Sequence, residues 1–235
     1  MTGSSAEGAP IEPVPAPAPR LGLRDPALLR KVAQLYAVAL ILVLVDQGVK
    51  YDVVDKLTTR FDGLATVSER LAALYGTPPP QGYDGLHFRP RRAPRGDPND
   101  PPGGVILSQC CLMIRYTENP GAAFGLFRRF PASARGPLFH LVSIGAVVLI
   151  TFYFLRLSGS RQERWARIGL PLVLGGALGN WVDRLARGFV IDFIEAHWRE
   201  VYSWPSFNVA DSAIVVGVAL LVIDGFVRKE RKPAA

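Results

Sequence analysis

Four stretches of the chain are strongly apolar, and polar or charged segments separate them. They cover about residues 31–50, 138–157, 168–184 and 209–227. A helix needs about 20 residues to cross the hydrocarbon core of a bilayer. A buried helix of a soluble protein is the alternative for any one stretch, but four in one chain favour membrane spans. The pattern therefore predicts a membrane all-α bundle of four transmembrane helices.

The third stretch is the shortest and is rich in glycine. Gly175 and Gly179 stand in a Gly-x-x-x-Gly pattern, and small residues at this spacing let two helices approach closely. We therefore expect the third span to be packed inside the bundle.

Lysine and arginine residues gather at three places beside the predicted spans. An even number of spans puts all three places on one side of the membrane, and cytoplasmic loops carry the excess of basic residues. Both chain termini are therefore expected to be cytoplasmic. The residues concerned are Arg20, Arg24, Arg30 and Lys31, then Arg156, Arg161, Arg164 and Arg167, then Arg228, Lys229, Arg231 and Lys232.

The two ends of the chain are predicted to lie outside the bundle. Residues 1–30 are rich in proline and alanine and cannot bury a core, so we expect a disordered cytoplasmic tail. They are not expected to be a signal peptide, because early basic residues and a prompt apolar run are both lacking. Residues 31–232 then form one four-span domain, and 233–235 form a short C-terminal tail.

Two connections are expected on the outer side of the membrane. The first holds an insertion at about 51–104, in which 67–75 suits a short surface helix and 77–104 an irregular linker. Residues 105–117 are rich in β-formers and predict one or two strands, a small extracytoplasmic β element. The second connection, 184–208, is compact and carries Trp198, Tyr202 and Trp204, which suit a membrane–water interface.

Composition supports a membrane protein and weakens the case for nucleic-acid binding. Charged residues make up only 20% of the chain, against about 25% in soluble domains. The net charge of +7 would suit a nucleic acid, but residues 1–30 and 51–104 are each balanced in charge. The excess therefore lies beside the spans, where it contacts lipid, and no nucleic-acid partner is expected.

Cysteine and histidine offer neither a disulfide framework nor a metal-binding spacing in this sequence. Cys110 and Cys111 are adjacent in a predicted strand, and we interpret them as packing residues. His140 falls inside the second span and suits a buried polar contact, while His87 lies in the linker and His197 near the interface. We expect no metal and no other cofactor.

Charged residues inside membrane spans are costly, so each one here needs an explanation. Asp46 and Lys50 stand one helical turn apart in the first span, which suits an ion pair. Asp183 and Arg184 end the third span and suit a second pair that stabilises the bundle. Spacing alone gives all four a structural role.

Two further aspartates lie between the third and fourth spans. Asp192 stands inside the apolar run 189–194, and such surroundings raise the pKa of a carboxyl. Asp211 lies in the first turn of the fourth span, where an acid also favours the helix dipole. Both positions are expected at the outer face, so the two carboxylates can converge. A pair that shares one proton is the arrangement by which aspartic proteases activate water.

Five blocks of residues, taken in this order, resemble the lipoprotein signal peptidase (signal peptidase II) family of membrane aspartyl proteases. The resemblance covers about 31–232, apart from the linker. The blocks are Asp46-Gln-Gly-Val-Lys50, Asn119-Pro-Gly-Ala-Ala-Phe124, the run from Gly175 to Arg184, the run from Gly188 to Ile194 with His197 and Trp198, and Phe207-Asn-Val-Ala-Asp211.

The resemblance implies an endopeptidase that removes the signal peptide of diacylglyceryl-modified prolipoproteins, cutting just before the lipidated cysteine. It implies that Asp192 and Asp211 are the catalytic dyad. It further implies a bacterial inner-membrane location with the active site near the outer surface, contact with membrane lipid, and inhibition by globomycin-type peptides. A monomer suffices for this chemistry. Residues that would support the site or bind substrate are Asn119, Gly121, Asn180, Arg184, Asn208, Asp46, Lys50 and Asp183.

Two features depart from the family's usual pattern. The connection after the first span is extended by about 51–104, and Pro120 follows Asn119 where threonine or another small residue is common. The insertion either alters substrate access, partner choice or inhibitor sensitivity, or is a neutral surface addition. Two other functions stay open on the sequence alone. One is a homologue that binds precursors without cutting them, and the other is a small transporter with Asp46, Asp183 and Asp224 on a proton path.

Overall fold

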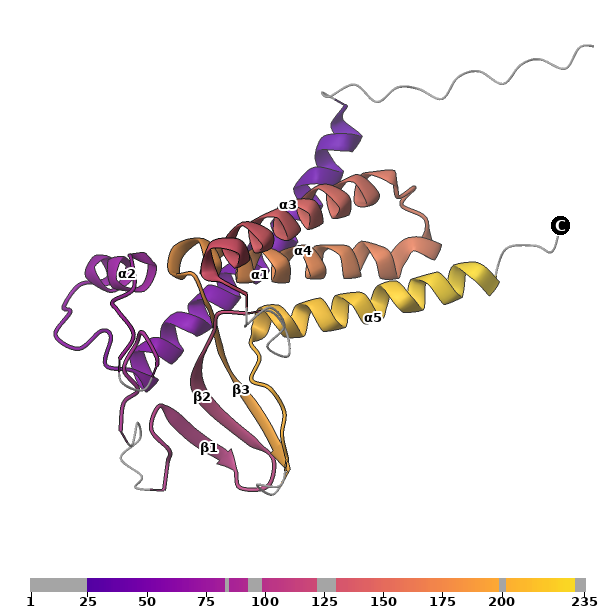
Figure 1. Cartoon of the computed structure of the whole chain (residues 1–235). Helices are drawn as coiled ribbons and strands as arrows, with labels where there is room; N and C mark the ends of the chain where they lie inside the picture. Colours follow the sequence, from indigo (N-terminus) through magenta and orange to yellow (C-terminus); the bar gives the residue numbers. More distant parts are fainter. Residues whose placement is uncertain (1–24, 83–84, 93–98, 122–129, 199–201, 231–235) are drawn as a thin grey trace, which may run out of the picture.

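The computed structural model describes residues 25–82, 85–92, 99–121, 130–198 and 202–230. Four helices of this part have 22 residues or more. They lie together, and a small sheet extends from one end of them (Figure 1). The elements in chain order are α1 (Pro26–Leu57), α2 (Val67–Tyr75), β1 (Gly104–Ser108), β2 (Leu112–Asn119), α3 (Ala132–Arg156), the 3-10 turn η2 (Arg161–Glu163), α4 (Arg164–Arg187), β3 (Val190–Trp198), β4 (Tyr202–Ser203) and α5 (Val209–Glu230). Most of the predicted N-terminal tail, the C-terminal tail and residues 122–124 lie outside the described part.

The first helix begins earlier than the sequence predicts. The side chain of Asp25 accepts a hydrogen bond from the backbone N–H of Ala27 (2.8 Å), and Pro26 follows it in the first turn. Both features favour a helix start, because a capping oxygen satisfies a free N–H and proline has none to satisfy. Residues 26–30 are therefore helical, and the predicted boundary of the disordered tail at residue 30 is wrong.

Three helices of the described part are long and apolar enough to cross a membrane, namely α1, α3 and α5. Large apolar side chains stand exposed on each, as Ile41, Leu149 and Val215 show at 62%, 69% and 68% exposure. α4 is also long, but charged residues near both of its ends lower its apolarity. The membrane character is thus plain, while the predicted number of four spans is not confirmed by composition.

α4 packs against α1, α3 and α5, which agrees with the expected inner position of the third stretch. Its glycines permit this packing. A Cβ at Gly175 would lie 2.9 Å from the Cβ of Leu42 on α1, and a Cβ at Gly176 would lie 2.4 Å from the carbonyl oxygen of Ala210 on α5. Both distances are too short for any side chain, so the backbones approach closely only because glycine stands there.

Replacing Gly176 by alanine is expected to lower the thermal unfolding midpoint in detergent, because the added methyl forces α4 and α5 apart. Overpacking of this kind costs about 1–3 kcal/mol. Gly145→Ala in α3 is the matched control, since a Cβ at Gly145 meets no atom within 4 Å. Tryptophan fluorescence measures the unfolding midpoint of each variant. Equal midpoints for Gly176→Ala and Gly145→Ala would contradict a tight contact between α4 and α5.

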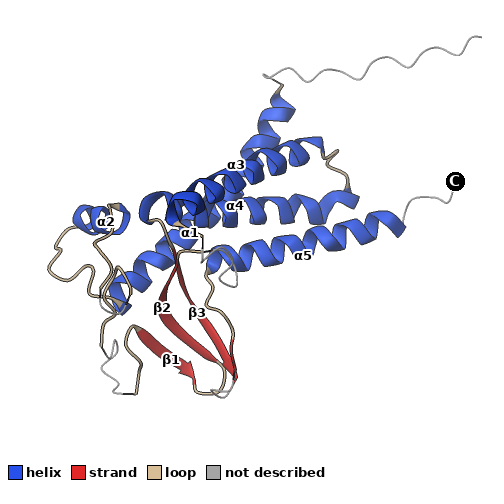
Figure 2. Ribbon diagram, in the orientation of Figure 1, coloured by secondary structure: helices blue, strands red, loops and turns tan. Residues whose placement is uncertain are grey.

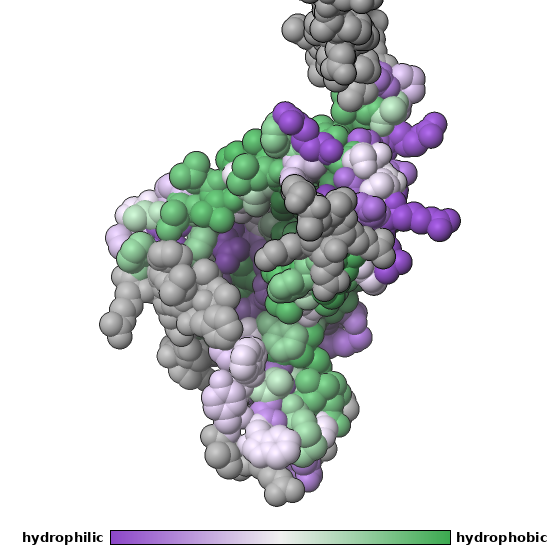
Figure 3. Space-filling model, turned by 90° about the vertical axis from the view of Figure 1, so that its right-hand side faces the viewer, coloured by the Kyte–Doolittle hydropathy of each residue, from purple (hydrophilic) through white to green (hydrophobic). Residues whose placement is uncertain are grey.

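The basic residues beside the helices gather at one end of the bundle. Lys31 of α1 donates from Nζ to the carbonyl oxygens of Leu155 (3.2 Å) and Leu157 (2.5 Å), and Arg228 of α5 reaches Glu163 (3.6 Å). Figure 3 faces this end and shows hydrophilic side chains projecting beside hydrophobic flanks. We call it the basic end, and the opposite end of the bundle the sheet end.

The strands form one antiparallel sheet in the order β1-β2-β3-β4. Figure 2 shows β1, β2 and β3 side by side. The register of β2 and β3 places Thr117 opposite Asp192 and Asn119 opposite Val190. β1 and β2 form where strands are predicted for 105–117, and they begin one residue before this range and end two residues after it. No strand pattern marks β3, because residues 190–193 are each at most 3% exposed. A strand buried on both faces lacks the alternation of apolar and polar positions that identifies a strand.

Residues 51–57 of the insertion continue α1, and the described remainder folds against the sheet end of α1 and the sheet. α2 forms at the predicted residues, and Thr66 and Glu69 build a capping box at its start. The predicted linker also turns back toward the sheet end, where Phe88 is 1% exposed and packs with Phe189 and Tyr116. Part of the irregular segment is therefore a structural component of the sheet-end core.

The interpretation of Cys110 and Cys111 as packing residues is wrong. They lie in the turn between β1 and β2, Cys110 is exposed, and their sulfur atoms are joined in a disulfide. Strand-forming neighbours in the sequence suggest a longer strand, but the chain reverses direction here. Cys110 is therefore exposed and Cys111 half-buried, and neither belongs to the buried core.

Candidate active site

Asp192 and Asp211 line the same cavity at the sheet end. Asp192 lies on β3 and Asp211 in the first turn of α5. The close pairing of β2 with β3, together with the packing of α4 on α5, brings the two segments together. The expected convergence of the two carboxylates is therefore seen in the fold.

The start of α5 fixes the position of Asp211. Asn208 stands before the helix, and its Oδ1 accepts from the backbone N–H of Asp211 (2.9 Å). Asp211 reciprocates, since its Oδ2 accepts from the backbone N–H of Asn208 (3.3 Å). This reciprocal pair is a capping arrangement, so the helix-terminal role considered for Asp211 is real. One carboxylate oxygen is left for other contacts.

Three asparagine amides join the two carboxylates into one network. Asp192 accepts from Nδ2 of Asn208 (2.7 Å) through Oδ1 and from Nδ2 of Asn119 (3.0 Å) through Oδ2. Asp211 accepts from Nδ2 of Asn180 (2.7 Å) through Oδ1. The amide of Asn208 also donates to Oδ1 of Asn180 (3.1 Å), which closes the connection between the two acids.

Burial and charge together favour the protonated form of Asp192. The residue is 2% exposed. Desolvation by burial is the main cause that raises the pKa of Asp192 from 3.8 to about 7, and the nearby charge of Asp211 adds to it. The amides of Asn119 and Asn208 act in the opposite direction. A carboxyl with a pKa near neutrality can hold a proton or give it up under physiological conditions.

The cavity that holds the two carboxyls has a volume of about 910 Å³ and mainly apolar walls. Leu138, Val142 and Ala146 of α3 face Ile214 and Val215 of α5 across it. Polar groups gather at one side, where Asn119, Asn180, Asp192, Arg184 and Asp211 line the wall. A site of this kind suits a ligand with a long apolar part and a polar reactive part.

Arg184 reaches this cavity instead of pairing with Asp183. Its Nη2 donates to the carbonyl oxygen of Gly121 (2.8 Å), and its guanidinium lies over the ring of Phe139 at 4.4 Å. The predicted Asp183–Arg184 pair is wrong, because neighbouring helix residues point in different directions. Within the described residues, the buried Nε of Arg184 has no hydrogen-bond partner.

Asp183 belongs to a buried charge cluster made of Asp46, Lys50, Asp183 and Arg187. Nζ of Lys50 lies 2.7 Å from Asp46 and 2.9 Å from Asp183, and Arg187 donates to Oδ1 of Asp183. The side chains of all four have no exposed surface. The predicted Asp46–Lys50 pair is thus present, but it is half of a larger cluster with balanced charge.

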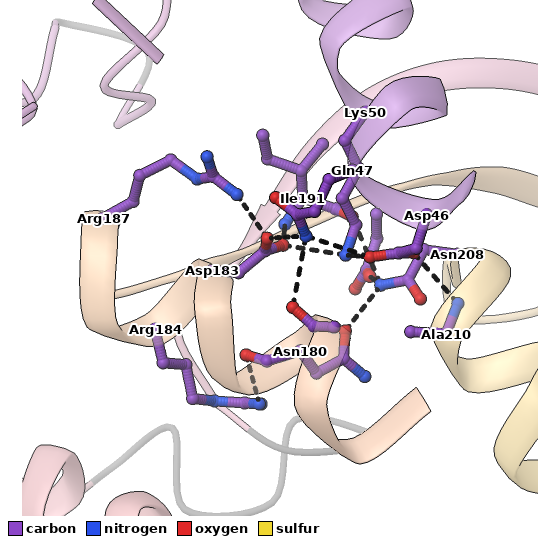
Figure 4. Close-up of polar contacts among 12 residues, drawn as sticks. Asp46, Gln47, Lys50, Asn180, Asp183, Arg184, Arg187, Ile191, Asn208 and Ala210 are labelled. Atoms are coloured by element: carbon purple, nitrogen blue, oxygen red, sulfur yellow. Dashed lines mark hydrogen bonds and ion pairs between the residues drawn. The ribbon is translucent and has the colours of Figure 1, made fainter. Parts of the chain in front are cut away.

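The buried charge cluster holds the backbone beside each of the two acids. Oδ2 of Asp183 accepts from the N–H of Ile191 (3.1 Å), and Oδ1 of Asp46 accepts from the N–H of Ala210 (3.0 Å). Figure 4 shows these contacts converging from α1, α4, β3 and α5. Since Ile191 and Ala210 directly precede Asp192 and Asp211, the cluster fixes the chain at both acids.

Two residues of this region have no role assigned by the sequence. Gln47 donates from Nε2 to Asp183 (2.8 Å), Asp46 (3.1 Å) and the carbonyl oxygen of Gly179 (3.2 Å). Arg187 pairs with Asp183 one helical turn away. The i,i+4 spacing of Asp183 and Arg187 is a signal that could have identified the second residue, whereas the contacts of Gln47 span distant segments.

The other residues that the sequence singles out make contacts that stabilise the fold. Gly121 donates its N–H to Oδ1 of Asn119 (3.0 Å), and His140 accepts from Nε1 of Trp181 (3.0 Å). Asp224 lies at the basic end and pairs with Arg228 (2.6 Å), far along α5 from the buried charge cluster. Among the described residues, no three His, Cys, Asp or Glu side chains gather to hold a metal ion.

The chain is similar in sequence and in fold to known proteins. Residues 95–227 match the family described as signal peptidase (SPase) II. A lipoprotein signal peptidase of Anaeromyxobacter sp. (strain Fw109-5) is 43% identical over 197 residues, 82% of this chain and 84% of that protein. A lipoprotein signal peptidase of Geobacter sulfurreducens is 47% identical over 121 residues, 52% of this chain and 72% of that protein. A solved bacterial membrane enzyme shares the fold with a TM-score of 0.55 at 21% identity, over 87% of this chain and 94% of that chain.

Proposed function

Because this chain belongs to the signal peptidase II family, and is therefore a membrane protease that removes signal peptides from prolipoproteins, we propose that Asp192 and Asp211 catalyse the cut. The observation that carries the proposal is the shared amide network of the two acids at the wall of one cavity. Paired carboxylates with one proton between them supply both an acid and a base. The protease is thus of the aspartic type.

The reaction uses the two acids in different protonation states. Asp192, with its pKa raised to about 7 by burial, carries the proton and donates a hydrogen bond to the scissile carbonyl. Asp211 then takes a proton from a water molecule, which attacks the polarised carbon. The tetrahedral intermediate collapses when the leaving amine receives a proton from the pair. Since the two groups titrate jointly, the proton belongs to the pair rather than permanently to one oxygen.

The substrate is a prolipoprotein that bears a diacylglyceryl group on the cysteine after the cut. The apolar walls of the cavity, from Leu138 of α3 to Val215 of α5, suit acyl chains. Asn119 and Arg184 lie on the polar side and can bind the peptide backbone. Because acyl chains partition into the bilayer, contact with membrane lipid supplies much of the free energy of substrate binding. Globomycin-type peptides would compete for the same cavity.

The orientation in the membrane follows from the charges. α4 acts as a fourth span, shielded by the other three helices, and the basic end faces the cytoplasm. Both termini are then cytoplasmic, and the sheet end lies at the outer surface of the bacterial inner membrane. In this arrangement Asn180, Asn208 and the two acids sit where a translocated precursor arrives. One copy of the chain holds all of these residues, so a monomer suffices.

The test is cleavage of two forms of one precursor by the purified protein in detergent or vesicles. We expect the diacylglyceryl-modified prolipoprotein to be cut, with mass spectrometry placing the new N-terminus at the lipidated cysteine. The unmodified precursor should stay intact, because it lacks the group that fills the apolar cavity. If the modified precursor is not cut, the result would contradict the proposed protease activity. A cut at another bond would contradict the proposed cleavage position before the lipidated cysteine.

Cleavage is also expected to slow as the pH rises above about 7. Below the pKa of Asp192, which burial raises to about 7, the pair keeps its proton. Above that pH the proton is lost, both acids are charged and the carbonyl is no longer polarised. The rate should therefore fall about tenfold per pH unit on the alkaline side. A rate that stays flat from about pH 6 to pH 9, at constant protein stability, would contradict the shared proton.

A further inference from the structure

The helix α2 of the insertion ends directly on the buried charge cluster. Arg187 donates from Nη1 to the carbonyl oxygen of Leu74 (3.2 Å), and Arg60 donates from Nε (3.1 Å) and Nη2 (2.9 Å) to that of Ala73. The last carbonyls of a helix have no partner within it and carry partial negative charge. The two guanidiniums satisfy them, so the end of α2 is held at a defined place.

Tyr75, the last residue of α2, contacts the cluster with its side chain. The guanidinium of Arg187 lies over its ring at 5.2 Å, and its hydroxyl donates to Oε1 of Gln47 (3.0 Å). This hydrogen bond holds the Gln47 amide in the orientation that its NH₂ group already favours beside acceptors. With the oxygen held by Tyr75, the NH₂ group points to the two carboxylates of Asp46 and Asp183. A reversed amide would present its oxygen to them and be repelled.

The contacts continue from Gln47 to the chain beside both acids. Asp46 and Asp183, which accept from Gln47, also accept from the N–H groups of Ala210 and Ile191. The labelled side chains in Figure 4 show this arrangement, with Gln47 above Asp183 and Asp46 beside Ala210. A path of direct hydrogen bonds thus runs from the insertion to the residues that precede Asp192 and Asp211.

We propose that Tyr75 is a positioning residue for the Asp192–Asp211 pair and acts through Gln47. The inference rests on the proposed function of that pair. It gives the insertion a role: α2 orients the Gln47 amide, the amide orients the carboxylates of the buried charge cluster, and those carboxylates hold the backbone of both acids. Tyr75 itself lies outside the residues that line the cavity, so it affects the chemical step and not the binding of substrate.

The test compares Tyr75→Phe with Tyr153→Phe on the full chain and the diacylglyceryl-modified precursor. Phenylalanine keeps the ring over Arg187 and removes only the hydroxyl. The loss of one partly buried hydrogen bond is expected to lower kcat about fivefold, with KM changed by less than about twofold. Tyr153 is 46% exposed on α3 and serves as the control, for which both constants should stay at the wild-type values.

A double-mutant cycle with Gln47→Leu tests the path. If Tyr75 acts through Gln47, adding Tyr75→Phe to Gln47→Leu should leave kcat within about 1.5-fold of the single Gln47→Leu variant. An unchanged kcat in Tyr75→Phe, a change in KM alone, or a fully additive cycle would each overturn the inference. The first two outcomes concern Tyr75→Phe alone, so they would overturn the inference even if Gln47→Leu does not fold. A wild-type protein that cuts no precursor would instead overturn the proposed function.

Discussion

Replacing Asp192 by asparagine is expected to lower the cleavage rate by about 10³-fold or more, since each acid or base group contributes about 10²–10⁴-fold. The amide would keep the shape of the side chain but could neither hold nor release the shared proton. Asp211→Asn should fail to the same degree, because it removes the base. The two losses should not add in the double variant, since the acids act as one unit.

The Asp192→Asn substitution is also expected to change the pH dependence of stability. The pKa of Asp192 rises from 3.8 to about 7 on folding, because burial disfavours the charged form. The folded state therefore binds the proton more tightly, and stability falls as the pH rises through that window. Asp192→Asn removes this decline while it abolishes cleavage. Asp52→Asn, whose side chain is 57% exposed on α1, is the matched control and should cut normally.

An asparagine variant that cuts at the wild-type rate would contradict the assignment of its acid. The measurement is the initial rate on the diacylglyceryl-modified precursor, with circular dichroism to confirm that each variant is folded. A loss of cleavage together with a lower unfolding midpoint would instead indicate a structural role for the replaced acid.

Replacing Lys50 by methionine is expected to destabilise the fold by about 3–5 kcal/mol, the cost of leaving buried charges without a partner. Lys50 lies between Asp46 and Asp183 with no exposed surface on any of the three side chains. Without it the two carboxylates face each other and only Arg187 compensates. The carboxylates that accept from the N–H groups of Ile191 and Ala210 would no longer be held by Lys50, so cleavage should fall along with stability.

The first helix offers a matched control for this change. Lys56 pairs with Asp52 at the same i,i+4 spacing on α1, but the two side chains are 66% and 57% exposed. Exposed pairs contribute little to stability because water screens them, so Lys56→Met should leave the unfolding midpoint nearly unchanged. Thermal unfolding in detergent compares the two variants directly. Similar unfolding midpoints for Lys50→Met and Lys56→Met would show that burial of the charge cluster contributes little to the stability of the fold.

The sequence predicts the local features of this protein well. Apolar stretches mark the long helices, the capping residues Thr66 and Glu69 begin α2 where expected, and spacing pairs Asp46 with Lys50. The meeting of Asp192 with Asp211 follows from two helix ends at one face of the bundle. Each of these predictions depends on residues that are close in the chain or on a simple topological rule.

Long-range contacts account for what the sequence leaves out. β3 has no strand pattern because both of its faces are buried, and Asp183 prefers Lys50 from α1 to its neighbour Arg184. The role of Gln47 depends on α2, α4 and the side chain of Asp46 at once. Such contacts form only after distant elements have packed, and the spacing of one segment carries no trace of them.

We expect Asp192 and Asp211 to work as one titrating pair. The most direct measurement is the pKa of the Asp192 carboxyl, followed by carbon-13 NMR of labelled aspartate in the wild type and in Asp211→Asn. We expect a pKa of about 7 in the wild type, and a lower value in the variant, because the charge of Asp211 is gone while the burial stays. An ordinary pKa near 3.8 in the wild type, or a raised value that Asp211→Asn leaves unchanged, would contradict the claim.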